Sequence, residues 1–280
     1  MTTDFTGTVT LGASGLRTSR MGIGADAGLD AASLEWAFER GINYFYWGTR
    51  RTAGMKQAIR TLAPKHRDKM VIALQSYDVT GLAMNYGFRR GLRQLKLDYA
   101  DVLILGKRDG PVPRRIQDKI VGLKEAGLVK HLCISAHDRK AYESHLSSGI
   151  YDLIMVRYNC AHPGAEKEVF PLLEPMERRP GVIVYNSTRW GHLFDPAWMP
   201  QGEETPDPTH LYRHALSHSA VDMVLTAPST RAQLEQNLAT LEQGPLSADE
   251  YEWLARVGAH VHVHNPNTKW DFVRQGKAPG

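Results

Sequence analysis

The sequence predicts a single (β/α)₈ TIM barrel, and three observations support that prediction. The chain has 280 residues, a length that suits one barrel domain of roughly 250 residues with some additions. Short apolar runs alternate with longer amphipathic stretches along the chain, a rhythm typical of βα units around a parallel sheet. The rhythm repeats eight times, which favours a closed barrel over an open sheet.

The predicted strands are short runs dominated by Val, Ile, Leu and Met. They cover residues 19–23, 42–46, 70–74, 101–105, 129–134, 153–158, 182–185 and 223–225. Amphipathic helices are expected between them, at residues 31–40, 55–63, 85–95, 115–126 and 139–147. Gly41 and Gly127 directly follow two of these helices, where a glycine commonly ends a helix.

Two segments lie outside the eight units. Residues 9–19, "VTLGASGLRTS", read as a β-hairpin with a glycine-containing turn, which we expect to close the bottom of the barrel. Residues 187–208 form a long loop, rich in Pro, Trp and Gly, after the seventh strand. A loop of this length is usually functional, and it lies on the side where barrel active sites are built. No repeat or linker divides the chain, so we expect one domain over residues 1–280.

The composition narrows the classes of partner. The formal net charge is +4, with Lys and Arg scattered along the chain, whereas nucleic-acid binding needs a concentrated basic stripe. No run approaches the ~18 apolar residues of a membrane span, and the N-terminus lacks a signal-peptide pattern. The two cysteines cannot make a disulfide framework, which indicates a reducing compartment. We expect a cytoplasmic protein whose partner is a small-molecule substrate; the oligomeric state stays open.

Six segments occur in an order that resembles the aldo-keto reductases. They are "LGASGLRTSRMGIG", "AFERGINYF", "LKLDYADVLIL", "LKEAGLVKHLCIS", "YDLIMVRYN" and "LEQNL", and the match runs from about residue 9 to residue 242. The resemblance implies a (β/α)₈ barrel that binds NADP(H) across the C-terminal ends of its strands. It also implies carbonyl reduction by a tetrad of Asp, Tyr, Lys and His.

The four tetrad positions carry other residues in this chain. The family's aspartate falls on Tyr46, its tyrosine on Arg51, its lysine on Gln75 and its histidine on Gly106. In the family the tyrosine protonates the carbonyl oxygen, the lysine and aspartate lower its pKa, and the histidine orients the carbonyl. The usual proton donor is therefore absent, and the resemblance implies redox chemistry without the usual mechanism.

The nicotinamide contacts of the family are only partly kept. Ser135 matches the serine that binds the carboxamide, and Tyr185 matches the aromatic residue that stacks on the ring. Asn159 matches the asparagine of the family's Tyr-Asn pair. The asparagine and glutamine expected beside the carboxamide are replaced by Ala136 and Met155.

The adenosine contacts have changed as well. Asn237 resembles the residue that contacts the adenine, while Ser229 and Gln233 stand where cations usually bind the 2′-phosphate. NADP or NAD is the cofactor that the resemblance implies, and the changed contacts predict weak binding with little preference for NADP.

Four residues are candidates for the chemistry. Tyr46 and Arg51 predict a phenol and a cation at the barrel mouth, since a nearby guanidinium favours phenolate; alternatively, the pair has drifted after a loss of function. Lys107, in "GKRDG", is either a further cation or a solvated loop residue. His137, after the fifth strand, is either a general base or a residue that orients its loop.

Aromatic residues near the expected mouth predict an apolar pocket wall. These are Trp47, Tyr77, Trp190 and Trp198; the two in the long loop could instead hold that loop in place. His260, His262 and His264 alternate in "HVHVH". If extended, they would share one face and could bind a metal; otherwise they belong to a tail strand or loop. We expect no metal, because no Cys, Asp or Glu completes a site nearby.

The sequence therefore predicts a divergent enzyme that acts on a small organic molecule at the C-terminal end of a barrel. Two alternatives stay open. One is a non-redox reaction on the same scaffold, such as a proton transfer, a dehydration or a cyclisation. The other is a non-catalytic barrel that binds or senses a ligand. The fold alone does not name a substrate.

Overall fold

Eight parallel strands close into a barrel, as the sequence predicts. The computed structural model describes residues 4–24, 28–48, 52–77 and 80–265. Hydrogen bonds connect the barrel strands in the order β10-β3-β4-β5-β6-β7-β8-β9. Their bounds are β3 (Met21–Gly24), β4 (Tyr44–Trp47), β5 (Val71–Ser76), β6 (Ala100–Leu105), β7 (Val129–Ser135), β8 (Leu153–Arg157), β9 (Gly181–Tyr185) and β10 (Met223–Thr226).

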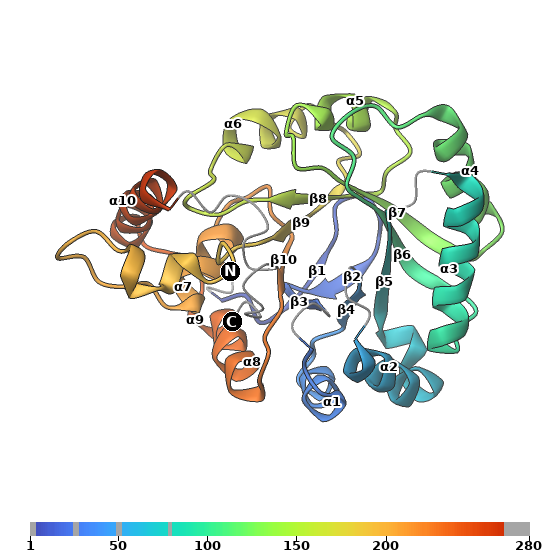
Figure 1. The fold of residues 1–280 in the computed structure, drawn as a ribbon, viewed down its shortest axis with the longest axis horizontal. Helices are drawn as coiled ribbons and strands as arrows, with labels where there is room; N and C mark the ends of the chain where they lie inside the picture. Colours follow the sequence, from blue (N-terminus) through green and yellow to red (C-terminus); the bar gives the residue numbers. More distant parts are fainter. Residues whose placement is uncertain (1–3, 25–27, 49–51, 78–79, 266–280) are drawn as a thin grey trace.

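Helices surround the barrel, as Figure 1 shows. They are α1 (Ala31–Glu39), α2 (Ala53–His66), α3 (Gly81–Leu95), α4 (Arg114–Glu125), α5 (Ala141–Ser147), α6 (Ala165–Glu168), α7 (Pro208–Leu216), α8 (Arg231–Leu238), α9 (Thr240–Gln243) and α10 (Ala248–His264). Short 3₁₀ turns are η1 (Arg67–Lys69), η2 (Phe170–Leu172), η3 (His192–Phe194) and η4 (Pro196–Trp198). The five helices predicted from the sequence are all present, with ends shifted by a few residues.

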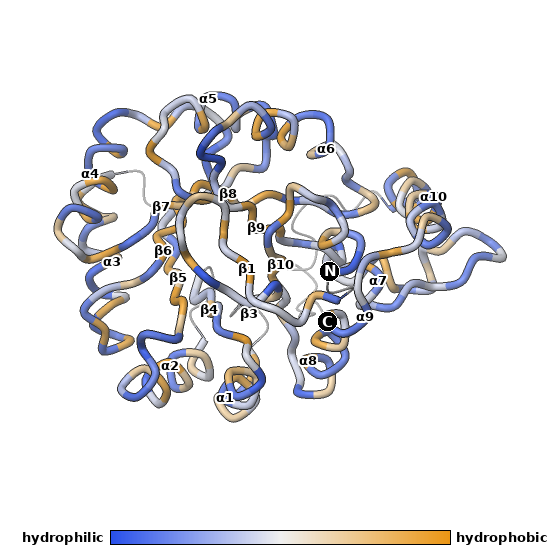
Figure 2. Tube along the Cα trace, turned by 180° about the vertical axis from the view of Figure 1, so that it is seen from behind, coloured by the Kyte–Doolittle hydropathy of each residue, from blue (hydrophilic) through white to orange (hydrophobic). Residues whose placement is uncertain are grey.

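The barrel strands bury side chains on both faces, and Figure 2 shows them mostly apolar. In β4, Tyr44 and Tyr46 belong to the cluster that fills the barrel, whereas Phe45 and Trp47 belong to the cluster between barrel and helices. This is the period of two expected of a strand. Glycine makes room for the large inner residues: a Cβ at Gly22 would lie 2.9 Å from the Tyr44 ring and 2.7 Å from Met223.

An N-terminal hairpin closes the bottom of the barrel, as predicted. Strands β1 (Thr8–Thr10) and β2 (Arg17–Ser19) pair antiparallel. Between them, Leu11 is fully buried in the cluster that fills the barrel. The Ala13 N–H donates to the Arg179 carbonyl at 2.9 Å, just before β9 begins. The hairpin therefore covers the N-terminal ends of the strands, which leaves the opposite end for a site.

The alternating histidines near the C-terminus lie in a helix, so the expectation of a strand or loop there was wrong. His260, His262 and His264 belong to α10, where residues two apart do not share a face. His260 stacks on His264 with 3.9 Å between ring centroids, while His262 lies against His162. Within the described residues there is no group of three or more side chains that could hold a metal ion.

No helix in the described part of the chain is both long and apolar enough to cross a membrane.

Candidate active site

Five inward-facing side chains surround the C-terminal opening of the barrel. We call them the mouth ring: Tyr46, Gln75, Ser135, Arg157 and Tyr185. Each lies two residues after a side chain that fills the barrel interior. Each therefore points to the inside of the barrel, near the C-terminal end of its strand. Active sites of (β/α)₈ enzymes occupy this end.

Tyr46 faces the barrel interior and not the outer helices. Its side chain is only 4% exposed and packs in the interior cluster. A Cβ at Gly24 would lie 3.6 Å from its ring, and a Cβ at Gly48 would overlap the ring. Two glycines thus leave space for this phenol at the mouth. Arg51, its predicted partner, lies outside the described residues.

An amide and a glycine stand side by side at two further positions of the mouth. Gln75 is 6% exposed and Gly106 follows the end of β6. A Cβ at Gly106 would lie 2.5 Å from Gln75 Nε2 and 3.5 Å from the Ser135 Cβ. The Gln75 amide therefore occupies the space between β6 and β7, where it presents a neutral hydrogen-bonding group to the mouth.

Arg157 and Tyr185 are neighbours on adjacent strands. Their Cα atoms pair in the β8–β9 ladder. Burial raises the pKa of Tyr185 to about 12, even though the nearby Arg157 guanidinium and Ser135 hydroxyl act to lower it. At neutral pH the phenol of Tyr185 keeps its proton and can donate a hydrogen bond to a ligand oxygen.

The loops after β6 and β7 add charged and titratable groups. Lys107 Nζ lies 2.8 Å from Asp109 Oδ2, and Asp109 Oδ1 accepts hydrogen bonds from the backbone amides of His137 and Asp138 at 2.6 and 3.0 Å. The charge of Lys107 is thus paired. The His137 ring lies 6.3 Å from the Tyr185 ring, between centroids.

His137 is uncharged at neutral pH. Burial lowers its pKa, and the positive charges of Lys107 and Arg157 lower it further, against a smaller opposing effect of Asp109. A neutral imidazole can accept a proton. The structure therefore brings two of the predicted catalytic residues, Lys107 and His137, to one side of the mouth near Tyr185.

The predicted aromatic wall is not one surface. Trp47 is fully buried among the helices, outside the barrel, and its indole N–H donates to the Thr52 carbonyl at 3.1 Å. Tyr77 is 48% exposed just after β5. Trp190 follows β9, and Trp198 packs against the cluster that joins the long loop to α7 and α10. Trp198 thus holds the loop in place, one of the two roles expected for it.

Asn159 joins two loops rather than facing open space. Its side-chain amide donates to the Asn186 carbonyl at 2.7 Å, and its oxygen accepts the Ala161 N–H at 3.1 Å. It is fully buried. These bonds fix the turn after β8 against the turn after β9, so Asn159 positions the mouth.

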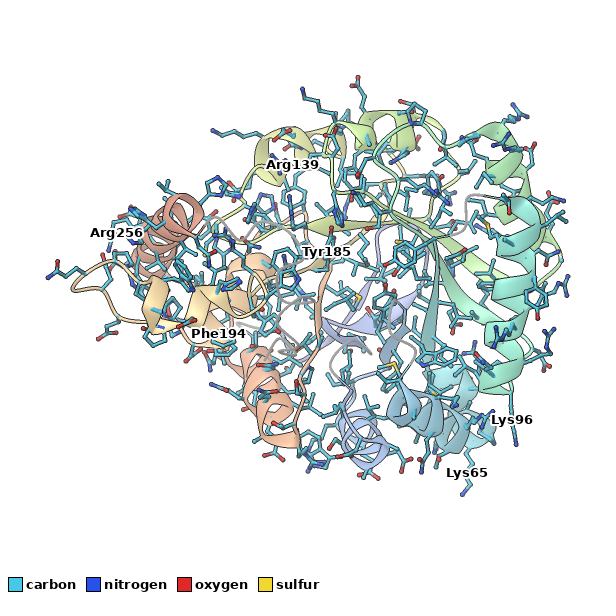
Figure 3. The ribbon with its side chains drawn as sticks, in the orientation of Figure 1. Lys65, Lys96, Arg139, Tyr185, Phe194 and Arg256 are labelled. Atoms are coloured by element: carbon cyan, nitrogen blue, oxygen red, sulfur yellow. The ribbon has the colours of Figure 1, made fainter. Side chains whose placement is uncertain are left out.

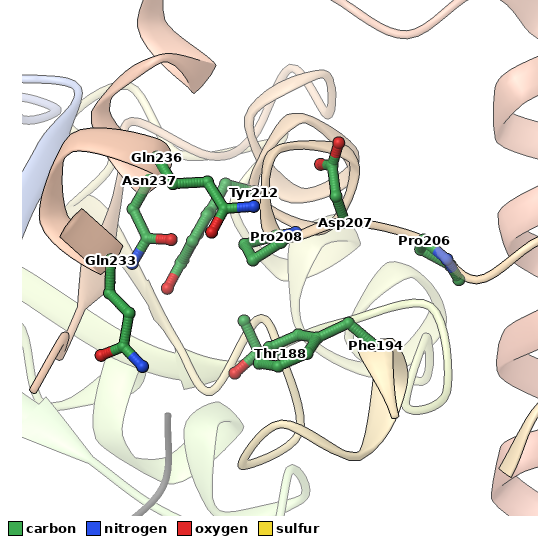
Figure 4. A pocket seen from close by; sticks show the side chains of 9 residues that line it. All are labelled: Thr188, Phe194, Pro206, Asp207, Pro208, Tyr212, Gln233, Gln236 and Asn237. Carbon is green, nitrogen blue, oxygen red and sulfur yellow. The ribbon is translucent and has the colours of Figure 1, made fainter. Parts of the chain in front are cut away.

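A second cavity, of about 270 Å³, lies beside the long loop. Figure 4 shows the amides of Gln233, Gln236 and Asn237 on one side and Thr188 and Phe194 on another. The remaining lining residues are Pro206, Asp207, Pro208 and Tyr212. Sites for whole drug-sized ligands begin near ~300 Å³. This cavity therefore suits one end of a ligand, such as the base of a nucleotide.

The polar groups of the second cavity are held by hydrogen bonds. The Asn237 amide donates to Thr226 Oγ1 at 2.8 Å, and Gln233 Oε1 accepts from the Ser229 N–H at 2.8 Å. Asp207 is the one charged residue that lines the cavity in the described part of the chain. No cation is among the described lining residues, so this surface has no side chain that would neutralise a phosphate group.

Sequence reasoning missed Arg157, although the signal was in the sequence. Leu153 and Met155 fill the barrel, so the same face of β8 carries Arg157 to the mouth. It also missed Arg189, which is fully buried beneath the long loop. A buried arginine in a loop has no pattern that distinguishes it from an exposed one.

Figure 3 places Tyr185 near the centre of the molecule, while Lys65, Lys96 and Arg256 lie at the periphery.

The closed parallel barrel, the hairpin plug and the polar mouth define a (β/α)₈ barrel protein with its site at the C-terminal end. Solved structures narrow this to the aldo-keto reductase fold. The holo form of the aldo-keto reductase AKR11C1 from Bacillus halodurans is 22% identical, with a TM-score of 0.75 over 90% of this chain and 96% of that one. An aldo-keto reductase from Klebsiella pneumoniae, solved in complex with NADPH, is 19% identical, with a TM-score of 0.74 over 90% and 95%.

At these identities the likeness establishes the fold. No family model and no curated protein matches the chain.

Proposed function

We propose that the protein is a divergent enzyme of the aldo-keto reductase kind, which acts on a small organic substrate at the barrel mouth. The observation that supports this most is the mouth ring, because polar side chains are concentrated where barrel enzymes hold their reacting groups. The proposed reaction is linked to NAD(H) or NADP(H) and does not use the usual tetrad.

The second cavity is the proposed seat of the adenosine end of the cofactor. This cavity lies against the loop that follows β9, and Asn237 is one of its lining residues. The Klebsiella pneumoniae neighbour was solved with NADPH. When bound, the nicotinamide would supply or accept a hydride. Ser135, at the end of β7, and Tyr185, at the end of β9, are the residues that would border its ring.

The protein's own groups would handle the proton. Tyr185 keeps its proton at neutral pH, and Tyr46 is a second buried phenol at the mouth. His137 is neutral and can accept a proton. Arg51 remains a candidate from the sequence alone.

Cofactor titration tests this proposal. The chain has six tryptophans, so quenching of their fluorescence by NADH and by NADPH reports binding. Saturable quenching by NADH, at least as tight as by NADPH, supports the redox branch. If neither NADH nor NADPH quenches the fluorescence, a non-redox reaction or a ligand-binding barrel is favoured instead. The neutral amide of Gln75 beside Gly106, where the resemblance expects a lysine and a histidine, is the observation that keeps the non-redox branch open.

Placing a cation in the second cavity should shift the cofactor preference. Gln236 is exposed at the rim of the cavity. In Gln236→Arg, we expect NADPH affinity to rise about tenfold relative to NADH, because a charge-assisted hydrogen bond contributes about 1.5–3 kcal/mol before solvent screening. Isothermal calorimetry with both cofactors measures the ratio.

The matched control is Gln57→Arg, on the exposed face of α2, which adds the same charge away from the cavity. An equal shift in both variants would mean that net charge alone attracts NADPH and that the cavity is not the adenosine site.

Removing one hydroxyl at the mouth should impair function without unfolding the protein. Tyr46→Phe keeps the ring that fills the space left by Gly24 and Gly48. We expect a loss of about 10²-fold in turnover, the lower range for losing a general acid. Turnover is measured on whichever carbonyl or hydroxy compound a substrate screen identifies, and the melting temperature reports the fold.

Tyr44→Phe is the control for this variant. Tyr44 lies two residues earlier on the same inner face, is fully buried, and its hydroxyl has no hydrogen-bond partner among the described residues. Its loss should leave turnover unchanged. If both variants keep full turnover, Tyr46 is packing alone.

A further inference from the structure

Arg157 is a cation at the barrel mouth that has no counter-ion among the described residues. It ends β8 on the inner face, half-buried, and its Nε atom is shielded from solvent without a hydrogen-bond partner. In the part of the chain that the structure describes, its guanidinium forms neither a hydrogen bond nor an ion pair. The Nε atom has lost its water without gaining a partner, which is unfavourable, while the Nη atoms are not among the shielded atoms. The guanidinium is therefore open to an external anion.

Two carboxylates in the described part of the loops around the mouth are already engaged. Asp109 pairs with Lys107 at 2.8 Å and accepts two backbone amides. Glu168 pairs with Arg139 at 2.7 Å. Neither forms an ion pair with Arg157, so neither of these two acids neutralises its charge.

The other basic groups that the structure describes next to Arg157 are either neutral or buried away from the opening. Arg189 donates to two backbone carbonyls and is fully buried. Burial, together with the charges of Arg157 and Arg189, lowers the pKa of His162 to about 3. His137 is neutral as well. Among the described residues, Arg157 therefore brings to this place a positive charge that no ion pair balances, which suits a monoanion.

We propose that Arg157 binds a carboxylate group of the substrate. The planar guanidinium presents paired N–H donors that match the two oxygens of a carboxylate. The phenol of Tyr185, on the adjacent strand position, borders the same space and can donate to a neighbouring oxygen. This inference deepens the proposed function, on which it rests, by naming the substrate class: a small organic acid held at the mouth by its carboxylate.

Benzoate and its neutral analogue benzamide test this directly, with neither cofactor nor turnover. Binding to the whole protein at low ionic strength is followed by ligand-observed NMR. We expect benzoate to bind at least about tenfold more tightly than benzamide, the lower range for one charge-assisted hydrogen bond. Arg157→Gln should remove that difference. Arg157→Lys keeps the charge but not the paired N–H donors of the guanidinium, so it should keep part of the difference.

Arg256→Gln is the matched control, since Arg256 lies on α10 at the periphery and pairs with Glu203. It should bind benzoate like the parent protein, and unchanged melting temperatures should show that all variants are folded. Equal affinity for benzoate and benzamide, or benzoate binding that survives Arg157→Gln, overturns the proposal. Inorganic phosphate that binds more tightly than benzoate through Arg157 overturns the carboxylate class.

Failure of this proposal and failure of the proposed function give different results. If NADH and NADPH do not bind but benzoate binds through Arg157, the redox function fails and the carboxylate site stands. If NADH binds and benzoate does not, the redox function stands and the substrate class is wrong.

Discussion

Reduction of a simple aromatic aldehyde by NADPH is expected to be at least about 100-fold slower than in an aldo-keto reductase that carries the tetrad. Loss of one general acid costs about 10²–10⁴-fold, and the resemblance implies that its supporting groups are replaced too. At the mouth, the Gln75 amide and Gly106 occupy two of the corresponding positions. Neither an amide nor a glycine can lower the pKa of a phenol as a lysine does.

The measurement is the loss of NADPH absorbance with benzaldehyde, run beside a tetrad enzyme at the same concentration. A second series with 4-carboxybenzaldehyde, which carries a carboxylate, separates the lack of a proton donor from the lack of a group that Arg157 can bind. Both aldehydes should be poor substrates if the proton donor for carbonyl reduction is missing. Robust turnover of benzaldehyde would mean that another residue has taken the role of the tetrad tyrosine.

The fold was predictable because a parallel barrel has a simple signature in sequence. Its strands are buried on both faces, so they appear as short apolar runs separated by amphipathic helices. The hairpin was predictable from its glycine-containing turn, and β1 and β2 confirm it. Because side chains alternate along a strand, Tyr46 lies inside the barrel and Trp47 lies outside it. The sequence contained this alternation, but the prediction of Trp47 as a pocket residue did not use it.

The histidines of α10 show how a local pattern misleads. The alternation in "HVHVH" resembles a strand, yet the helix that contains it begins with a capping box between Ser247 and Glu250. That box, with Ser and Glu three residues apart, was readable in the sequence and outweighs the alternation that begins at His260. A helix propagates from its start, so the distant signal fixed the conformation.

The chemistry of the site was less predictable, because side-chain partners lie far apart in sequence. Asn159 was predicted to contact a cofactor, and the bonds that the structure shows for it, to Asn186 and Ala161, hold two loops together. Lys107 was predicted either as a cation of the site or as a solvated loop residue, and the structure pairs its charge with Asp109. Hydrogen bonds of this kind depend on loop conformation, which has no periodic signature.

Arg189→Ala is expected to lower the free energy of unfolding by about 3 kcal/mol or more. The Arg189 side chain is fully buried, and its guanidinium donates to the carbonyls of Val261 and Asn265 at 2.7 and 2.8 Å, at the end of α10. Hydrogen bonds of charged groups contribute about 1.5–3 kcal/mol each, and the truncation leaves a cavity as well. Relief of the cost of burying a charge offsets part of this loss. Urea denaturation measures it.

The same arginine fixes the conformation of the long loop. Arg189 and Trp190 adopt positive φ angles of 50° and 56°, and each costs roughly 1–2 kcal/mol for an L-residue. The bonds to α10 sustain this strain, and the loop carries Thr188 and Phe194 into the second cavity. Arg189→Ala should therefore also weaken NADH binding, if NADH binds there.

Two further variants separate the causes of that loss. Arg189→Met keeps most of the volume and removes the donors, so it should retain part of the stability lost in Arg189→Ala if the cavity matters. Arg256→Ala removes an exposed arginine whose carboxylate partner is Glu203, and a surface change of this kind stays within about 0.5 kcal/mol. If Arg189→Ala changes stability no more than Arg256→Ala does, the buried guanidinium does not hold the loop to α10. The strained turn must then be stabilised by its other contacts, such as the bond from the Trp190 N–H to Asn186 Oδ1.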